Sequence, residues 1–266
     1  MKKIKTIILR TAGTNCDMET AHAFRLAGAE AELVHINALK KKKNALSGYH
    51  ILAIPGGFTY GDDVASGKIL ANELKSTLNK ELSRFVASGR LIIGICNGFQ
   101  VLVKMGLLPD IKNDGQRHIE ATLSLNDSGR FEDRWVYLKK EKSSKCVWTK
   151  DLPGIIYIPV AHGEGKFIPR NTEVLRALKA NGQIVFRYTD EEGQAAPYPA
   201  NPNGSVNDIA GISDTSGRIL GMMPHPERHV TYLQHPNWRR LGPDSSGMGV
   251  GLKVFKNGVK FARNNL

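Results

Sequence analysis

Short apolar runs alternate with longer amphipathic segments from the N-terminus to Pro109. The runs are rich in β-branched residues and are flanked by turn-forming residues, which is the pattern of strands buried on both faces of a sheet. They predict strands at Ile4–Leu9, Ala31–Ile36, His50–Ile54 and Leu91–Ile95. Helices are predicted between them, so this half of the chain should consist of strand–helix–strand units with right-handed crossovers.

The clearest helix is predicted over Ile69–Ser88, with Gly89 ending it. One face of this helix is apolar, because leucine recurs every four residues, at Leu70, Leu74, Leu78 and Leu82. A second helix is predicted from Asp17, as its cap, to Leu26, with Gly28 ending it. Strands and helices that alternate in this way form a mostly parallel sheet.

After Pro109, apolar and polar residues alternate, which predicts an antiparallel portion. The polar, proline-rich stretch Ala195–Ser205 is predicted to be a long surface loop and not a linker, because strand-like segments resume after it. We therefore predict a single domain over residues 1–266. The strands predicted in this half are residues 119–125, Trp135–Leu138, Ile155–Val160, Val206–Ile212 and Arg218–Met223.

Composition narrows the class of protein. Of the 266 residues, 41% are hydrophobic, which permits a large core and excludes disorder as the dominant state. Lysine and arginine number 37 against 25 aspartates and glutamates, a net charge of +12 that suits an acidic partner or a phosphorylated ligand. Association with an acidic partner should then weaken as salt is added, and salt-insensitive association would contradict it. The run Lys40–Lys43 is interpreted as a solvated loop.

Cysteine usage and hydropathy predict a cytoplasmic location. Cys16, Cys96 and Cys146 form neither a disulfide framework nor a paired metal motif, and an odd number of cysteines suits a reducing compartment. No apolar run is long enough for a signal peptide or a membrane span. Cys16 and Cys146 are interpreted as inert buried cysteines.

The most informative segment is the turn from a predicted strand into a short apolar helix around Cys96. A strand-to-helix turn of this kind raises a nucleophile above the sheet edge in strained backbone, so its neighbours must be small. Gly94 and Gly98 meet that need. Amides at the start of the next helix can stabilise a thiolate or an oxyanion. We predict that Cys96 is a nucleophile, and it then needs a base, because a free thiol is only about 3% ionised at pH 7.

The best candidate for that base is His225, which follows a predicted strand. Pro226 favours an extended backbone at His225, so Glu227 should point to the same side and hydrogen-bond one imidazole nitrogen. The other nitrogen would then face Cys96. A metal site built from His225, Glu227 and His229 is the alternative, but no second Cys/His cluster completes it, and we expect no metal.

A glycine pair lies upstream, where Pro55, Gly56 and Gly57 follow a predicted strand. Ligands of open α/β sheets bind at the carboxyl ends of the strands. The amides of Gly57 and Asn97 could therefore form an oxyanion hole, although a turn chosen only for backbone freedom explains the pair equally well.

Three motifs follow one another along the chain: Pro-Gly-Gly at 55–57, Gly-x-Cys-x-Gly-x-Gln at 94–100 and His-Pro-Glu at 225–227. Together they resemble the class I, triad-type glutamine amidotransferases. Segments 13–17, 55–62, 161–165, 200–205 and 221–228 are similar to the glutaminase subunits of phosphoribosylformylglycinamidine synthase, over nearly the whole chain. The resemblance implies an α/β fold with a flavodoxin-like open, mostly parallel sheet, helices on both faces and an added antiparallel portion.

The resemblance further implies that Cys96 attacks glutamine, that His225 serves as base and that Glu227 orients His225. Ammonia would pass to a synthetase subunit that converts formylglycinamide ribonucleotide to its amidine in purine biosynthesis. The resemblance also implies a small accessory subunit. ATP and magnesium would act in the synthetase, because this chain has no Walker-type loop and we expect no cofactor in it. Substrate contacts are assigned by the same resemblance to Gly56, Phe58, Gln100, His162, Gly163 and Glu164.

Two other classes of protein remain as alternatives. A flavodoxin-like stress protein or thiol sensor also places a cysteine at such a strand-to-helix turn, here called an elbow. It does not require His225 or Glu227. A nucleic-acid-binding module is suggested only by the net charge, and no recognised motif supports it. We expect neither nucleic acid nor membrane as a partner.

Overall fold

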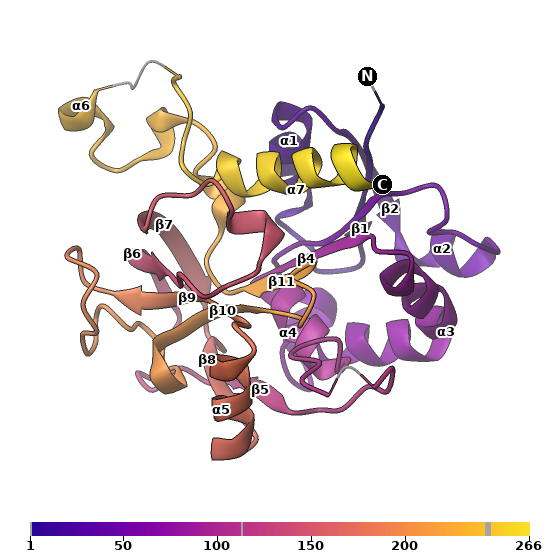
Figure 1. Cartoon of the computed structure of the whole chain (residues 1–266), viewed down its shortest axis with the longest axis horizontal. Coiled ribbons are helices and arrows are strands. Elements are labelled where there is room, and N and C mark those ends of the chain that lie inside the picture. Colours follow the sequence, from indigo (N-terminus) through magenta and orange to yellow (C-terminus); the bar gives the residue numbers. More distant parts are fainter. Residues whose placement is uncertain (1, 113, 243–245) are drawn as a thin grey trace.

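The structure is a computed structural model that describes residues 2–112, 114–242 and 246–266. These residues form a nine-stranded sheet with helices on both faces, together with a separate two-stranded sheet (Figure 1). The strand order of the large sheet is β2-β1-β3-β4-β11-β10-β9-β6-β7. The predicted fold class, an open α/β sheet with an added antiparallel portion, is confirmed.

The first five strands in that order run parallel to one another. They are β2 (Glu30–His35), β1 (Lys5–Arg10), β3 (Ile51–Ile54), β4 (Leu91–Ile95) and β11 (Ile219–Met222). The order 2-1-3-4 followed by one more parallel strand is that of flavodoxin-like sheets. In the N-terminal half, the predicted strands are confirmed to within one residue at each end.

Helices cover both faces of this parallel portion (Figure 1). On one face, α1 (Asp17–Leu26) packs against α7 (Leu252–Asn265), and on the other α3 (Lys68–Ala87) packs against α4 (Asn97–Lys104). The remaining α-helices are α2 (Ile36–Lys41), α5 (Thr172–Ala180) and α6 (Trp238–Leu241). Short 3-10 helices occupy Thr59–Asp62, Val147–Thr149, Val206–Asp208, Pro226–Arg228 and Tyr232–Gln234.

Two details at the helix ends differ from the predictions. Cys16, and not Asp17, is the N-cap of α1; Asp17 is the first helical residue and pairs with Arg10. The lysine run is not wholly a loop, because Lys40 and Lys41 end α2, and Lys40 pairs with Glu73 of α3. In both places the charged side chain pairs with a residue of a neighbouring element, which the local sequence does not show.

The antiparallel half extends the sheet beyond β11. The strands β10 (Ile209–Ser213), β9 (Ile184–Thr189), β6 (Glu132–Lys140) and β7 (Ile155–His162) pair antiparallel in that order. The separate sheet pairs β5 (Ala121–Ser124) with β8 (Lys166–Pro169). Part of the predicted surface loop is in fact buried: Asn201, Asn203 and Ser205 lie inside, because their side chains hydrogen-bond one another, nearby backbone and His162.

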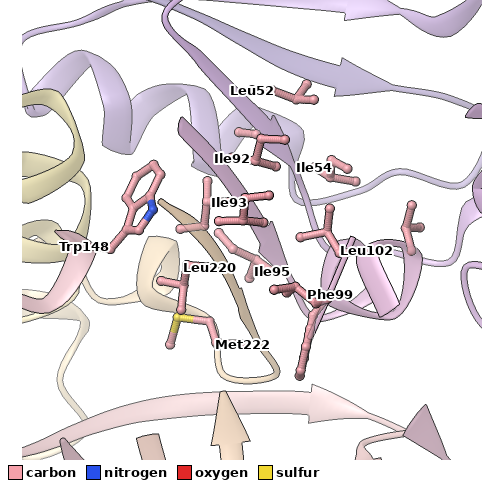
Figure 2. Close-up of a cluster of buried hydrophobic side chains, with 14 of the residues drawn as sticks. Leu52, Ile54, Ile92, Ile93, Ile95, Phe99, Leu102, Trp148, Leu220 and Met222 are labelled. Carbon is pink, nitrogen blue, oxygen red and sulfur yellow. The ribbon is translucent and has the colours of Figure 1, made fainter. Parts of the chain in front are cut away.

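The core beneath the site centres on β4 (Figure 2). Ile92, Ile93 and Ile95 are fully buried, as a central strand covered on both faces requires, and Phe99 and Leu102 of α4 pack beside them. The register aligns Ile54 with Gly94 and Ile95 with Met222, which brings the carboxyl ends of β3, β4 and β11 together. Among the helices of the described residues, none is both long and apolar enough to cross a membrane.

Candidate active site

Cys96 occupies a sharp turn between β4 and α4. Its backbone has φ 51° and ψ −107°, a region that non-glycine residues rarely adopt and that stores strain at functional sites. The Cys96 amide donates to Met222 O of the neighbouring strand at 2.8 Å, which fixes the turn to the sheet edge. The predicted strand, turn and helix are therefore present, with the thiol at the carboxyl end of the sheet.

The two glycines beside Cys96 are required by close backbone packing. A Cβ atom at Gly98 would lie 1.9 Å from Ile54 O, and one at Gly94 would lie 2.6 Å from Gly98 O. Real Cβ atoms do not approach backbone that closely, so α4 can lie against β3 and β4 only while both positions lack a side chain.

We expect Gly98→Ala to lower the free energy of unfolding by about 3 kcal/mol, because the added methyl group would push α4 away from β3. Urea denaturation measures the change. Gly48→Ala is the matched control, since a Cβ atom there meets nothing within 4 Å, and we expect a change within about 0.5 kcal/mol. Equal urea midpoints for the two variants would contradict the close packing of Gly98 against Ile54.

His225 and Glu227 meet Cys96 from the end of β11, the strand next to β4. Glu227 Oε1 accepts a hydrogen bond from His225 Nδ1 at 2.6 Å, and both side chains are buried. The backbone between them is not extended, in contrast to the prediction: Pro226–Arg228 is a 3-10 turn, and Glu227 reaches the imidazole across it. The His225 amide donates to Pro159 O of β7 at 2.8 Å, which anchors the imidazole.

The imidazole is held in its charged form. Burial alone would lower the pKa of His225, but Glu227, Cys96 and Cys16 together raise that pKa well above its ordinary value. Within the described residues, His225 Nε2 has no close hydrogen-bond partner, so this nitrogen is free to exchange a proton with a reacting group. A cationic imidazole beside a thiol favours the thiolate, which is the nucleophile.

The turn of Gly56 and Gly57 after β3 packs against both His225 and Cys96. A Cβ atom at Gly56 would lie 2.7 Å from His225 Cε1 and 3.4 Å from Cys96 Cβ. Gly57 has φ +146° and fits against Gly13 O, which a Cβ atom would approach to 2.7 Å. Asn97 is the first residue of α4, so its amide has no acceptor within the helix. The structure thus places the two candidate oxyanion donors on turns that both border Cys96.

The side chain of Gln100 holds the 162–165 loop. Its Nε2 donates to Glu164 O at 2.5 Å, and its Oε1 accepts from Asn97 Nδ2 at 3.0 Å. The Glu164 carboxylate accepts from the Ser66 amide at 3.3 Å. Gln100 is buried, and these contacts occupy its amide group, so its direct role is to join the elbow to this loop.

His162 lies close to the nucleophile but is bound on both ring nitrogens. Nδ1 donates to Asn126 Oδ1 at 3.1 Å, and Nε2 accepts from Asn203 Nδ2 at 3.4 Å. Burial, together with the charge of His225, lowers the pKa of His162 to about 3, so His162 is neutral. Its neighbour Ala161 contributes O as an acceptor for Cys96 Sγ at 3.5 Å. A structural role for His162 therefore has direct support.

Two other predicted substrate contacts, Phe58 and Gly163, are partly exposed beside the site. Phe58 is 45% exposed and its ring lies 6.0 Å from that of Phe131. Gly163 is half-buried beside Phe131, and its carbonyl accepts from the Asn126 amide at 3.0 Å. Both residues lie on segments that adjoin the site, directly after Gly57 and His162, and among the hydrogen bonds and ring contacts of the described residues none joins them to the Cys96 side chain.

Cys16, interpreted from the sequence as an inert buried cysteine, is buried but borders His225 and Glu227. Its Sγ lies 4.0 Å from His225 Nδ1 and accepts a hydrogen bond from Arg228 Nη2 at 3.1 Å. The available signal was its position after β1, a strand whose carboxyl end shares the sheet edge with β4. In the described part of the chain, Cys16, His225 and Glu227 form the one compact group that could hold a metal, and the Arg228 guanidinium opposes a cation there.

Comparisons with known proteins agree with this geometry. Residues 3–262 match the model of a family described as the CobB/CobQ-like glutamine amidotransferase domain. The phosphoribosylformylglycinamidine synthase subunit PurQ of Dehalococcoides mccartyi is 53% identical over 264 residues, covering 99% of each chain. The subunit of the same name from Methanococcus maripaludis is 44% identical over 267 residues, covering 97% of each.

Solved structures show the same fold. A chain in the structure of PurLQS from Thermotoga maritima aligns with a TM-score of 0.74 at 30% identity, covering 98% of this chain and 99% of that one. A glutamine amidotransferase of the same organism aligns with a TM-score of 0.58 at 14% identity, over 98% and 99% of the two chains. The second likeness concerns the fold alone.

Proposed function

Because this chain belongs to the CobB/CobQ-like glutamine amidotransferase family, we propose that Cys96, His225 and Glu227 form its glutamine-hydrolysing triad. The function is that of the glutaminase subunit of phosphoribosylformylglycinamidine synthase, which supplies ammonia to a synthetase subunit in purine biosynthesis. One observation carries the assignment of the triad: a strained cysteine turn and a buried imidazole both border Gly56, and the imidazole Nδ1 lies 2.6 Å from a carboxylate.

The first half of the reaction forms a thioester. The Cys96 thiolate attacks the carbon of the glutamine side-chain amide, and the carbonyl oxygen becomes an oxyanion that the amides of Gly57 and Asn97 stabilise. His225 gives its Nε2 proton to the amide nitrogen, the carbon–nitrogen bond breaks, and ammonia leaves. Glu227 holds Nδ1 throughout, which keeps the imidazole in one orientation.

The second half regenerates the enzyme. His225 is now neutral and takes a proton from a water molecule, which attacks the thioester carbon through a second oxyanion. The carbon–sulfur bond breaks, glutamate leaves, and the thiolate and imidazolium are restored. The balance is one glutamine and one water consumed for one glutamate and one ammonia released. The residues that carry it need no cofactor, and ATP and magnesium are assigned to the synthetase.

The setting of the reaction is part of the proposal. We assign Gly56, Phe58, Gln100, His162, Gly163 and Glu164 to the shape of the glutamine pocket and its rim. Gln100 and His162 act by holding the loop that carries Gly163 and Glu164. A small accessory subunit completes the complex, and the complex works in the cytoplasm.

Reconstitution tests the function directly. The chain is mixed with its synthetase, ATP, magnesium and formylglycinamide ribonucleotide, and amidine formation is followed with glutamine or with ammonia as nitrogen donor. We expect glutamine to support the reaction only when this chain is present, whereas ammonia supports it with the synthetase alone. Glutamine use by the synthetase without this chain would contradict the assignment.

A further inference from the structure

Cys16 is a buried cysteine that the proposed reaction does not use. It is 1% exposed and ends the β1–α1 loop, and its amide donates to Gly56 O at 3.2 Å, which ties that loop to the glycine turn. Its side chain makes no capping bond to α1. Instead the sulfur points toward the triad, where it would lie 3.3 Å from a Cβ atom at Gly56.

The sulfur lies between two cations. On one side Arg228 Nη2 donates to it at 3.1 Å, and on the other the imidazole Nδ1 of His225 is 4.0 Å away. Arg228 follows Glu227 directly in the chain, and burial, which lowers the pKa of Arg228, is outweighed by Cys16 and Glu227, which raise it. The guanidinium is thus a charged donor within the field of the triad carboxylate.

In the described part of the chain, one oxygen of the Glu227 carboxylate is unpaired. Glu227 Oε1 binds His225, but within the described residues the buried Oε2 has no hydrogen-bond partner. A guanidinium binds a carboxylate more strongly than it binds a sulfur, and often through two parallel hydrogen bonds. Arg228 released from Cys16 would therefore turn to Glu227, and Glu227 would bind His225 less tightly.

We propose that Cys16 is a positioning residue: it holds the Arg228 guanidinium away from Glu227, and so reserves that carboxylate for His225. This inference rests on the proposed function of the triad. It makes the sulfur part of the glutaminase site without any contact with glutamine.

The consequence is electrostatic. The charged and titratable groups that face the imidazole are Glu227, Cys96, Cys16, His162 and Arg228. If Arg228 neutralises Glu227, the imidazolium loses its main support and the thiolate of Cys96 loses its counter-charge. Glutamine hydrolysis should then fall at neutral pH, and the pH range of activity should narrow from both sides.

The test compares Cys16→Ala in two backgrounds, within the complete synthetase complex. In the native background we expect about a tenfold loss of glutamine-dependent kcat, with both limbs of the pH profile moved toward each other. With Arg228→Met, which removes the competing cation, the same substitution should change kcat less than about twofold. Cys16→Ser, whose hydroxyl oxygen accepts from the guanidinium, should recover most of the lost rate. Cys146→Ala is the matched buried-cysteine control, far from the triad.

A second readout does not depend on glutamine. The rate at which iodoacetamide alkylates Cys96 is measured against pH, and the tryptic peptides 11–25, 91–104 and 146–150 separate the three cysteines by mass. We expect the midpoint for Cys96 to rise in Cys16→Ala and to return in the double variant. An equal loss in both backgrounds, an unmoved midpoint, or full activity in Cys16→Ala would each overturn the inference. Failure of the wild-type complex to use glutamine would overturn the proposed function instead.

Discussion

Cys96→Ala is expected to abolish glutamine-dependent amidine synthesis while leaving ammonia-dependent synthesis by the partner intact. The substitution removes the sulfur that forms the thioester, and a triad enzyme that loses its nucleophile falls by on the order of 10⁴-fold or more. The fold should survive, because the change deletes one atom at a position that is only 5% exposed and leaves Gly94 and Gly98 in place.

The measurement is the ratio of glutamine-dependent to ammonia-dependent rate in the reconstituted complex. Cys146→Ala is the control, because Cys146 is similarly buried but precedes the 3-10 helix Val147–Thr149, which packs against α7 and not against α4. The ratio should be unchanged in the control and close to zero in Cys96→Ala. Because ammonia-dependent synthesis does not need this chain, co-elution of Cys96→Ala with the synthetase is the check that the complex still assembles. Retention of both activities in that complex would mean that the nucleophile lies elsewhere.

His225→Gln is expected to lower glutamine-dependent turnover by roughly 10²-fold to 10⁴-fold, the usual contribution of a general acid–base group. Glutamine fills much of the imidazole volume, but it can neither take nor give the proton that departing ammonia requires. Single-turnover assays of the complex separate this loss from a change in glutamine binding. The exposed His22 of α1 provides the control substitution, and it should leave turnover unchanged.

The same variant separates two classes of protein. A thiol sensor built on this fold would keep the peroxide and alkylation chemistry of Cys96 without His225, because its elbow alone would suffice. In the glutaminase, the imidazolium supports the thiolate, so alkylation of Cys96 in His225→Gln should require a higher pH than in the native chain. Identical alkylation profiles in the two proteins would favour the sensor.

Local rules were sufficient for the strands of the parallel half of the fold. Strands such as Leu91–Ile95 are apolar throughout because both faces are covered, and Gly28 and Gly89 end their helices with φ of +85° and +77°. The elbow could also be predicted, because Gly94, Cys96 and Gly98 lie within five consecutive residues. By contrast, α5, α7, β8 and β9 were not predicted from the sequence. Their patterns of apolar residues make sense only once the sheet or helix that each one packs against is known.

What the sequence could not supply was proximity between distant loops. Nothing near Cys16 shows that its sulfur meets Arg228, which is more than two hundred residues further along the chain. The burial of Asn201 and Asn203 has the same origin, because their partners include His162 and residues of their own loop. The turn at Pro226–Arg228 differed for a local reason: a proline after His225 permits a 3-10 helix as well as an extended segment.

The covalent intermediate gives the sharpest test of the triad. The reconstituted complex is mixed with isotopically labelled glutamine, quenched in acid within one turnover, and digested, and the peptide 91–104 is weighed. A labelled glutamyl group should be found on Cys96, and His225→Gln should slow its formation. Glutamate released at the normal rate with peptide 91–104 unlabelled, or with the label on the Cys16 peptide, would contradict the mechanism.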